Sequence, residues 1–239
     1  NDTFKEMNLE DVKIEHLPEL EQLMLHKIYT LNLKFMNYFK NYDFHNLYKE
    51  LLNFCTTDLS AFYFDIRKDI LYCDDKESEK RKSTLVLLNS ILNSLLKWFA
   101  PILSFTSEEI YQLISKKNKS IHLEKFIDFP KNFKNNELNG KWNEILKIRD
   151  ICNLSIEEKR ANKEIGSSLE ASIEISLNKK LFELTKDIDF AELCITSKSL
   201  VKESSNDEVI VETKKAEGSK CSICWKIQTE ACERHSCPI

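Results

Sequence analysis

Glycine and proline are scarce in this chain of 239 residues, which contains three glycines and four prolines. Folds built from many short strands need such residues at their turns, so this composition argues against an all-β sandwich and favours long helices. Apolar runs of about 18 residues, the length of a membrane-spanning helix, are also missing. The first ten residues are too polar and acidic for a secretory signal. We therefore expect a cytoplasmic protein with no membrane partner.

Signatures of catalysis are missing as well. The sequence has no Gly-rich phosphate loop and no pattern of Ser, His and Asp, or of Cys and His, that predicts a nucleophile. The formal net charge is −4, whereas many nucleic-acid-binding domains are basic. Lys and Arg neutralise phosphates locally, however, so this charge does not exclude an RNA partner.

Apolar residues recur at intervals of three and four over most of the first 165 residues, which is the period of an amphipathic helix. The expected helices cover residues 19–40, 43–72, 79–100 and 141–163. Asp43 is the expected N-cap of the longest helix, residues 43–72. Pro101 should end the helix over residues 79–100, and Gly166 should cap the helix over residues 141–163. Long helices with short links predict an antiparallel bundle.

The pattern changes near residue 168. Residues 171–177 alternate between apolar and polar side chains, which predicts a strand. Further short strands are expected over residues 193–196, 199–201 and 208–213, and a short helix over residues 179–187. The predicted fold is therefore mainly α: a helical bundle, a small α/β module and a zinc knuckle. The corresponding domains are a linker over residues 1–16, the bundle over 17–167, the module over 168–217 and the zinc-binding segment over 218–239.

The eight cysteines fall into two groups. Those of the first group are scattered, and we expect them to be small buried apolar residues in a reducing compartment. They are Cys55, Cys73, Cys152 and Cys194. The second group lies after residue 220.

Cys221 and Cys224 of this second group form a C-x2-C pair, which can place two thiolates on one tetrahedral ion. Cys232, His235 and Cys237 are the available second-half ligands. We predict one structural Zn²⁺ in preference to a redox pair or unligated thiols. A segment this short cannot fold on apolar burial alone, so the metal would supply much of its folding free energy.

Basic residues gather near the predicted helix ends and turns. For any one of them, the ordinary interpretation is a solvated helix surface with salt bridges. Together they indicate a surface for an RNA hairpin, whose unstacked bases and phosphates suit Arg and aromatic side chains. The candidates are Arg67, Lys68, Arg81, Arg149, Arg160 and Lys163. Trp225 either covers the metal or stacks on an RNA base. Tyr63 and Tyr72 could also stack, but both fit the apolar stripe of a helix better.

Three motifs, in this order, carry a resemblance to a known family. They are APILSFTSEEIY from Ala100, GSSLEA from Gly166 and CSICW from Cys221. The chain resembles the anticodon-binding region of class I aminoacyl-tRNA synthetases. Valyl and leucyl enzymes share the helical domain, whereas the terminal CxxCW is similar to that of the bacterial isoleucyl enzymes.

The resemblance implies a monomer that binds the anticodon stem-loop of tRNA(Ile). It also implies a longer enzyme that charges this tRNA with isoleucine and hydrolyses mischarged valine, using ATP and Mg²⁺ in domains that precede residue 1. The HIGH and KMSKS signatures of those domains do not occur here. The family's second C-x2-C implies a fourth zinc ligand beyond residue 239, unless Cys232 or His235 takes that place. Cys237 is therefore favoured over Cys232 as a zinc ligand.

The resemblance also favours an RNA contact for Trp225. Two alternatives remain: a non-enzymatic zinc-knuckle module on a helical scaffold that binds protein or generic RNA, and the same region of a valyl or leucyl enzyme. A longer reading frame with the two class I signatures would favour the synthetase over the non-enzymatic module.

Overall fold

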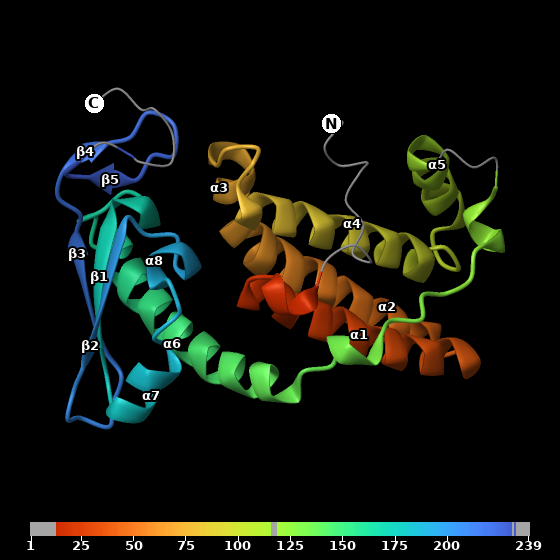
Figure 1. The fold of residues 1–239 in the computed structure, drawn as a ribbon, viewed down its shortest axis with the longest axis horizontal. Coiled ribbons are helices and arrows are strands. Elements are labelled where there is room, and N and C mark those ends of the chain that lie inside the picture. The colour runs from red at the N-terminus through yellow and green to blue at the C-terminus, as the bar shows by residue number, and fades with distance from the viewer. Residues whose placement is uncertain (1–12, 116–118, 231, 233–239) are drawn as a thin grey trace. The chain divides into compact units, whose positions relative to one another are not determined.

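The computed structural model describes residues 13–115, 119–230 and 232. The chain divides into two compact units (Figure 1). The first unit comprises Asn1–Asp58 and Lys76–Leu138, and the second comprises Leu59–Asp75 and Asn139–Ile239. No helix within the described ranges has both the length and the apolar character required to cross a membrane.

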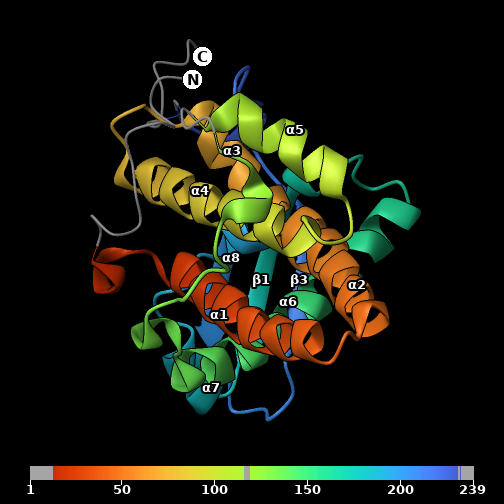
Figure 2. The same ribbon diagram turned by 90° about the vertical axis from the view of Figure 1, so that its right-hand side faces the viewer.

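The first unit is helical. Its α-helices are α1 (Glu19–Lys40), α2 (Phe44–Asn53), α4 (Glu79–Phe99) and α5 (Ser104–Ile114), with short 3₁₀ turns at Ile14–His16, Ile121–Leu123 and Lys131–Phe133. Helix α1 packs against both α2 and α4 (Figures 1 and 2). The side chain of Asp43 accepts a hydrogen bond from the Asn46 N–H at 3.2 Å, which confirms it as the N-cap of α2. Helix α4 ends two residues before Pro101, as predicted.

Trp98 occupies the centre of this unit's core. Its ring is fully buried and meets Phe35 edge-on, with 4.9 Å between ring centroids. The indole Nε1–H donates to Asn32 Oδ1 at 3.0 Å, and the Asn32 amide donates to the Ile127 carbonyl at 2.8 Å. A buried indole needs such a partner. The same Asn32 side chain ties the irregular chain after α5 to α1.

The long helix predicted over residues 43–72 is present, but not as one α-helix. Helix α2 is followed by a π-helical stretch, η4 (Phe54–Phe64), and then by α3 (Asp65–Cys73). The fully buried side chains Phe54, Leu59 and Tyr63 are five and four residues apart. These intervals suit the i→i+5 hydrogen bonds of a π-helix better than a 3.6-residue turn.

The second unit combines helices with a small sheet. Its elements after α3 are α6 (Asn136–Ala161), η7 (Ser168–Glu170), β1 (Ala171–Leu177), α7 (Lys179–Leu184), α8 (Phe190–Leu193), β2 (Lys198–Glu203) and β3 (Ile210–Lys215). The strand pair β4 (Ser219–Lys220) and β5 (Ile227–Gln228) follows. Strand β1 is central and pairs in parallel with β2 and antiparallel with β3.

Strand β1 confirms the predicted strand over residues 171–177. Alternate side chains, from Ala171 to Leu177, are buried. On that face Thr213 of β3 shares a 2.7 Å hydrogen bond with Ser155 of α6, so α6 covers it. Ser172, Glu174 and Ser176 point to the opposite face. The predicted fold class, mainly α with a small α/β module, is therefore confirmed.

Two local predictions in this unit are wrong. Residues 193–196 form no strand, because Asp189 accepts hydrogen bonds from the N–H groups of Ala191 and Glu192 and starts α8 instead. Gly166 does not cap α6, which already ends at Ala161. Lys163 takes the left-handed conformation there, with φ of +59°.

Candidate metal centre and nucleic-acid surface

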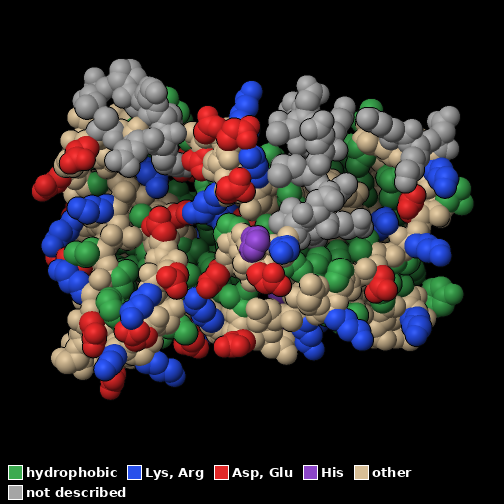
Figure 3. Space-filling model, viewed as in Figure 1, with side chains coloured by type: hydrophobic (Ala, Val, Ile, Leu, Met, Phe, Trp, Pro, Cys, Tyr) green, Lys and Arg blue, Asp and Glu red, His purple; other side chains and the backbone are tan. Residues whose placement is uncertain are grey.

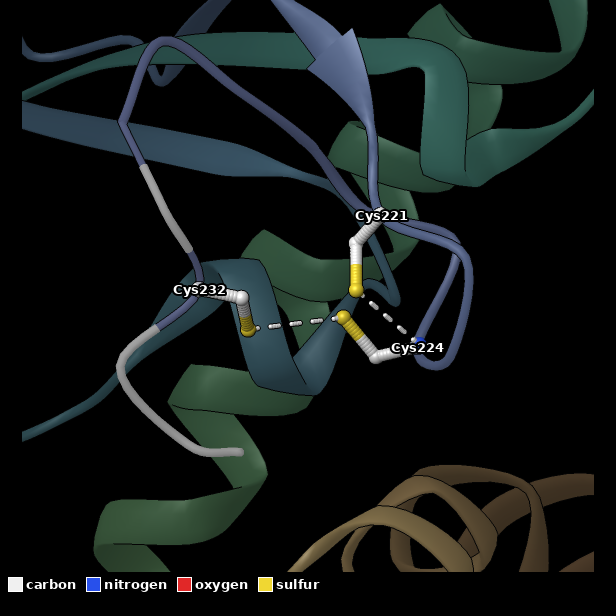
Figure 4. Close-up of side chains that lie close together, drawn as sticks. All are labelled: Cys221, Cys224 and Cys232. Carbon is white, nitrogen blue, oxygen red and sulfur yellow. Dashed lines mark hydrogen bonds between the residues drawn. The ribbon is translucent and has the colours of Figure 1, made fainter. Parts of the chain in front are cut away.

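Three cysteines meet beside the β4–β5 pair. Cys221 follows β4, Cys224 lies in the turn, and Cys232 follows β5; all three are buried, and their Sγ atoms lie within 4.8 Å of one another (Figure 4). The Sγ atoms of Cys224 and Cys232 are 3.9 Å apart. Tetrahedral bonds of about 2.3 Å to one zinc ion require a sulfur–sulfur spacing of about 3.8 Å. The three thiols thus fit a metal site.

Backbone N–H groups are already directed at this cluster. The N–H groups of Ile223 and Cys224 point to Cys221 Sγ, with N–S distances of 3.4 and 3.5 Å. The Trp225 N–H donates to the Cys221 carbonyl at 3.1 Å, which closes the turn. Donors aimed at sulfur favour its thiolate form.

Burial raises the pKa of the Cys224 thiol to about 12, and the neighbouring Cys221 and Cys232 contribute to the rise. Without a cation the Cys224 thiol therefore stays protonated at neutral pH. A divalent ion reverses this balance, because thiolates that coordinate it are stabilised by its charge. An all-sulfur donor set suits zinc among the common divalent ions. His235 and Cys237, the other predicted ligands, lie outside the described residues.

The scattered cysteines largely behave as predicted. Cys152 and Cys194 are buried, while Cys55 and Cys73 are half-buried. A hydrogen bond to Cys194, together with burial, raises the pKa of the Cys152 thiol. Cys73 packs against the three-cysteine cluster. None of these four positions offers a cluster of donors like that of Cys221, Cys224 and Cys232, which is called here the knuckle.

An apolar cavity of about 330 Å³ lies next to the knuckle. Its lining residues include Ile66, Tyr72, Leu169, Ile195, Ile223 and Trp225. Trp225 is 60% exposed, and its backbone is left-handed, with φ of +63°. Lys220 Nζ lies 5.5 Å from the centroid of the Trp225 ring. The cavity therefore presents a flat ring and a nearby positive charge to solvent.

Tyr72 was expected in the core, and that expectation is wrong: it is 86% exposed, whereas Tyr63 is fully buried as predicted. Tyr72 lies in the last turn of α3. A helix end can turn an aromatic residue outward even when its spacing follows the apolar stripe. The acidic, polar sequence that follows at residues 74–78 is the signal that could have revealed this.

Arg67 requires a correction. Sequence reasoning placed it on an RNA-binding surface, but its side chain is only 3% exposed and forms an ion pair with Glu192 of α8. Its guanidinium therefore joins α3 to α8. Arg149 also has an internal contact: its Nε–H donates to the Leu193 carbonyl at 2.9 Å, and its guanidinium lies over the Phe62 ring.

The other basic candidates lie nearer the surface. Lys68 is 55% exposed and pairs with Asp65 on its own helix. Arg160 Nη1 lies 2.5 Å from Glu157, and Lys163 is exposed in the turn that follows α6. Arg81, in the first turn of α4, belongs to the first unit and is half-buried. The second unit therefore brings Lys68, Arg160 and Lys163 to its surface.

Residues 21–175 match the family of anticodon-binding domains of tRNA ligases. The chain belongs to this family. Among curated relatives, the isoleucine–tRNA ligase of Pelagibacter ubique (strain HTCC1062) is 65% identical over 236 residues, covering 99% of this chain and 26% of the relative. That of Agrobacterium fabrum is 38% identical over 239 residues, covering 95% and 25%. That of Bartonella quintana is 38% identical over 221 residues, covering 88% and 23%.

This anticodon-binding domain thus spans about a quarter of the length of the curated relatives it matches. The family match ends within β1, so the rest of the sheet and the cysteine cluster lie beyond it. The relatives nevertheless cover nearly the whole chain. The family resemblance inferred from the three sequence motifs is confirmed.

Proposed function

We propose that this chain is the anticodon-binding region of an isoleucine–tRNA ligase and that it binds the anticodon stem-loop of tRNA(Ile). The observation that carries the proposal is the 65% identity to one such ligase over 99% of the chain. In the whole enzyme, a monomer of the cytoplasm, other domains would use ATP and Mg²⁺ to join isoleucine to the tRNA. Those domains would also hydrolyse mischarged valine.

We propose further that the knuckle holds one structural Zn²⁺. Cys221, Cys224 and Cys232 supply three of its four ligands, and Cys237 or His235 supplies the fourth. The spacing of the three described sulfur atoms and the N–H groups aimed at Cys221 Sγ support this assignment. Bound zinc would fix the turn that carries Trp225 and so hold the indole in position.

Trp225 is the proposed stacking residue for an unpaired base. Its exposed ring borders an apolar cavity that also contains Tyr72, and base stacking on an aromatic ring contributes about 1–3 kcal/mol. Lys68, Arg160 and Lys163 are the proposed phosphate contacts among the predicted residues. Arg67 and Arg149 are left out because their guanidinium groups already bind within the unit.

The test is binding of a fluorescently labelled tRNA(Ile) anticodon stem-loop, followed by anisotropy over a series of salt concentrations. We expect log affinity to fall by about 0.7–0.9 for each neutralised phosphate per tenfold rise in salt. A stem-loop with the three anticodon bases replaced should bind more weakly at every salt concentration. Equal affinity for the two RNAs, or binding that ignores salt, would show that the proposal is wrong.

A further inference from the structure

The uncovered face of the sheet carries lysines that sequence reasoning did not select. Ser172 of β1 pairs with Lys198 of β2 on one side and with Lys214 of β3 on the other. Paired residues point to the same face, and neighbouring strands lie about 4.8 Å apart. Two ammonium groups can therefore reach the same anion above Ser172. Figure 3 shows Lys and Arg side chains gathered over these strands, at the left of the view.

Lys215 links this row to residues at the end of α6. It lines a hollow of about 580 Å³ together with Ser172, Lys198 and Lys214. It also lines a second hollow, of about 560 Å³, that includes Arg160 and Lys163. These five residues, Arg160, Lys163, Lys198, Lys214 and Lys215, are called here the basic strip. All of them belong to the second unit.

Much of the charge on the basic strip lacks an internal counter-ion. Lys163, Lys198 and Lys215 are exposed and form no ion pair with any residue that the structure describes. Lys214 Nζ lies 3.1 Å from Glu212, and Arg160 is paired with Glu157. Both of those pairs are largely exposed, so they are weak and can exchange for a phosphate. Carboxylates also line both hollows: Glu217 and Glu230 line the larger one, and Glu157, Glu164 and Glu170 line the smaller one.

We propose that the basic strip is a binding surface for the phosphate backbone of the bound RNA. The strip follows the end of α6 and crosses onto the open face of the sheet, so an extended row of phosphates fits it better than a single small anion. The proposal rests on the proposed function, because it takes the RNA to be the anticodon stem-loop. It adds Lys198, Lys214 and Lys215 to the contacts and gives them a task without base specificity.

The experiment replaces Lys198, Lys214 and Lys215 together with Gln in the full chain. We expect the affinity for the stem-loop to fall at least tenfold at about 0.1 M salt, and the salt slope to decrease by about two. The ratio of affinities for the cognate and altered anticodons should stay unchanged, because backbone contacts carry no sequence information. The matched control replaces Lys179, Lys180 and Lys186 with Gln, which removes the same charge from exposed positions in and just after α7.

Three results would overturn the proposal. The first is a wild-type salt slope in the strip variant, and the second is an equal loss of affinity in the control. The third is competition by polyglutamate as strong as that by unlabelled stem-loop, which would make the strip a site for acidic proteins. Failure of the wild-type chain to distinguish the two anticodons would instead reject the proposed function. Circular dichroism checks that both variants remain folded.

Discussion

Replacing Arg67 separates its observed structural role from its predicted RNA contact. The guanidinium is 3% exposed and the Glu192 side chain 18% exposed. Arg67→Met leaves that carboxylate in a largely buried position without this cation. Breaking one side of a buried ion pair costs about 3–5 kcal/mol. Because Glu192 keeps some access to water, we expect a loss of about 3 kcal/mol in the free energy of unfolding.

Native-state hydrogen exchange of the β1 amides is the appropriate assay, since these amides report on the second unit. The double variant Arg67→Met with Glu192→Gln should recover part of the loss, because it also removes the carboxylate charge that the guanidinium neutralises. Lys68→Met is the surface control, and its effect should stay below about 0.5 kcal/mol. If Arg67→Met weakens RNA binding and leaves β1 protection unchanged, then the side chain faces solvent in the working protein and our assignment of its role is wrong.

Three further predictions concern other sites. His26 accepts a hydrogen bond at Nδ1 from the Asn135 N–H at 2.9 Å, and burial lowers its pKa below 6.5. Its contribution to stability is therefore full above pH 6.5 and is lost as the pH falls through the folded-state pKa, by at most about 1.4 kcal/mol per pH unit. Urea unfolding of wild type and of His26→Asn, which retains an acceptor, should show this slope in the wild type only. Metal analysis should find one zinc ion in the wild type and in Cys55→Ser and none in Cys224→Ser. Zinc affinity should also fall at lower pH, because protons compete for the thiolates. Retention of zinc by Cys224→Ser would contradict the assignment. Trp225→Ala should weaken stem-loop binding about 5- to 150-fold with little change in melting temperature, whereas Trp225→Phe should keep most of the affinity. Equal affinity of the wild type and both variants for the stem-loop would contradict the stacking role.

Local sequence signals predicted much of this fold. The bounds of α1 and β1 match the expected ranges because each depends on one unbroken pattern, of period 3.6 or period two. The N-cap role of Asp43 needs only a carboxylate and a free N–H three residues later. The π-helical stretch was missed because the apolar intervals of residues 54–64 were interpreted as those of an α-helix, although Phe54, Leu59 and Tyr63 lie five and four residues apart.

The candidate sites likewise divide into features that local sequence signals predict and features that depend on residues far apart in the chain. The C-x2-C spacing of Cys221 and Cys224 is local and predicted the candidate metal site directly. The ion pair between Arg67 and Glu192 joins residues 125 positions apart, and no periodicity relates them. The row Lys198–Ser172–Lys214 likewise exists only once three strands pair in their observed register.

Lys163 and Trp225 share an unusual backbone geometry, with φ of +59° and +63°. A side chain in this region costs about 1–2 kcal/mol that glycine avoids. Glycine at either place should therefore raise the melting temperature while deleting a proposed ammonium or indole contact. A laboratory selection for heat resistance alone would favour glycine in these two turns and would produce a more stable protein that binds the proposed RNA more weakly.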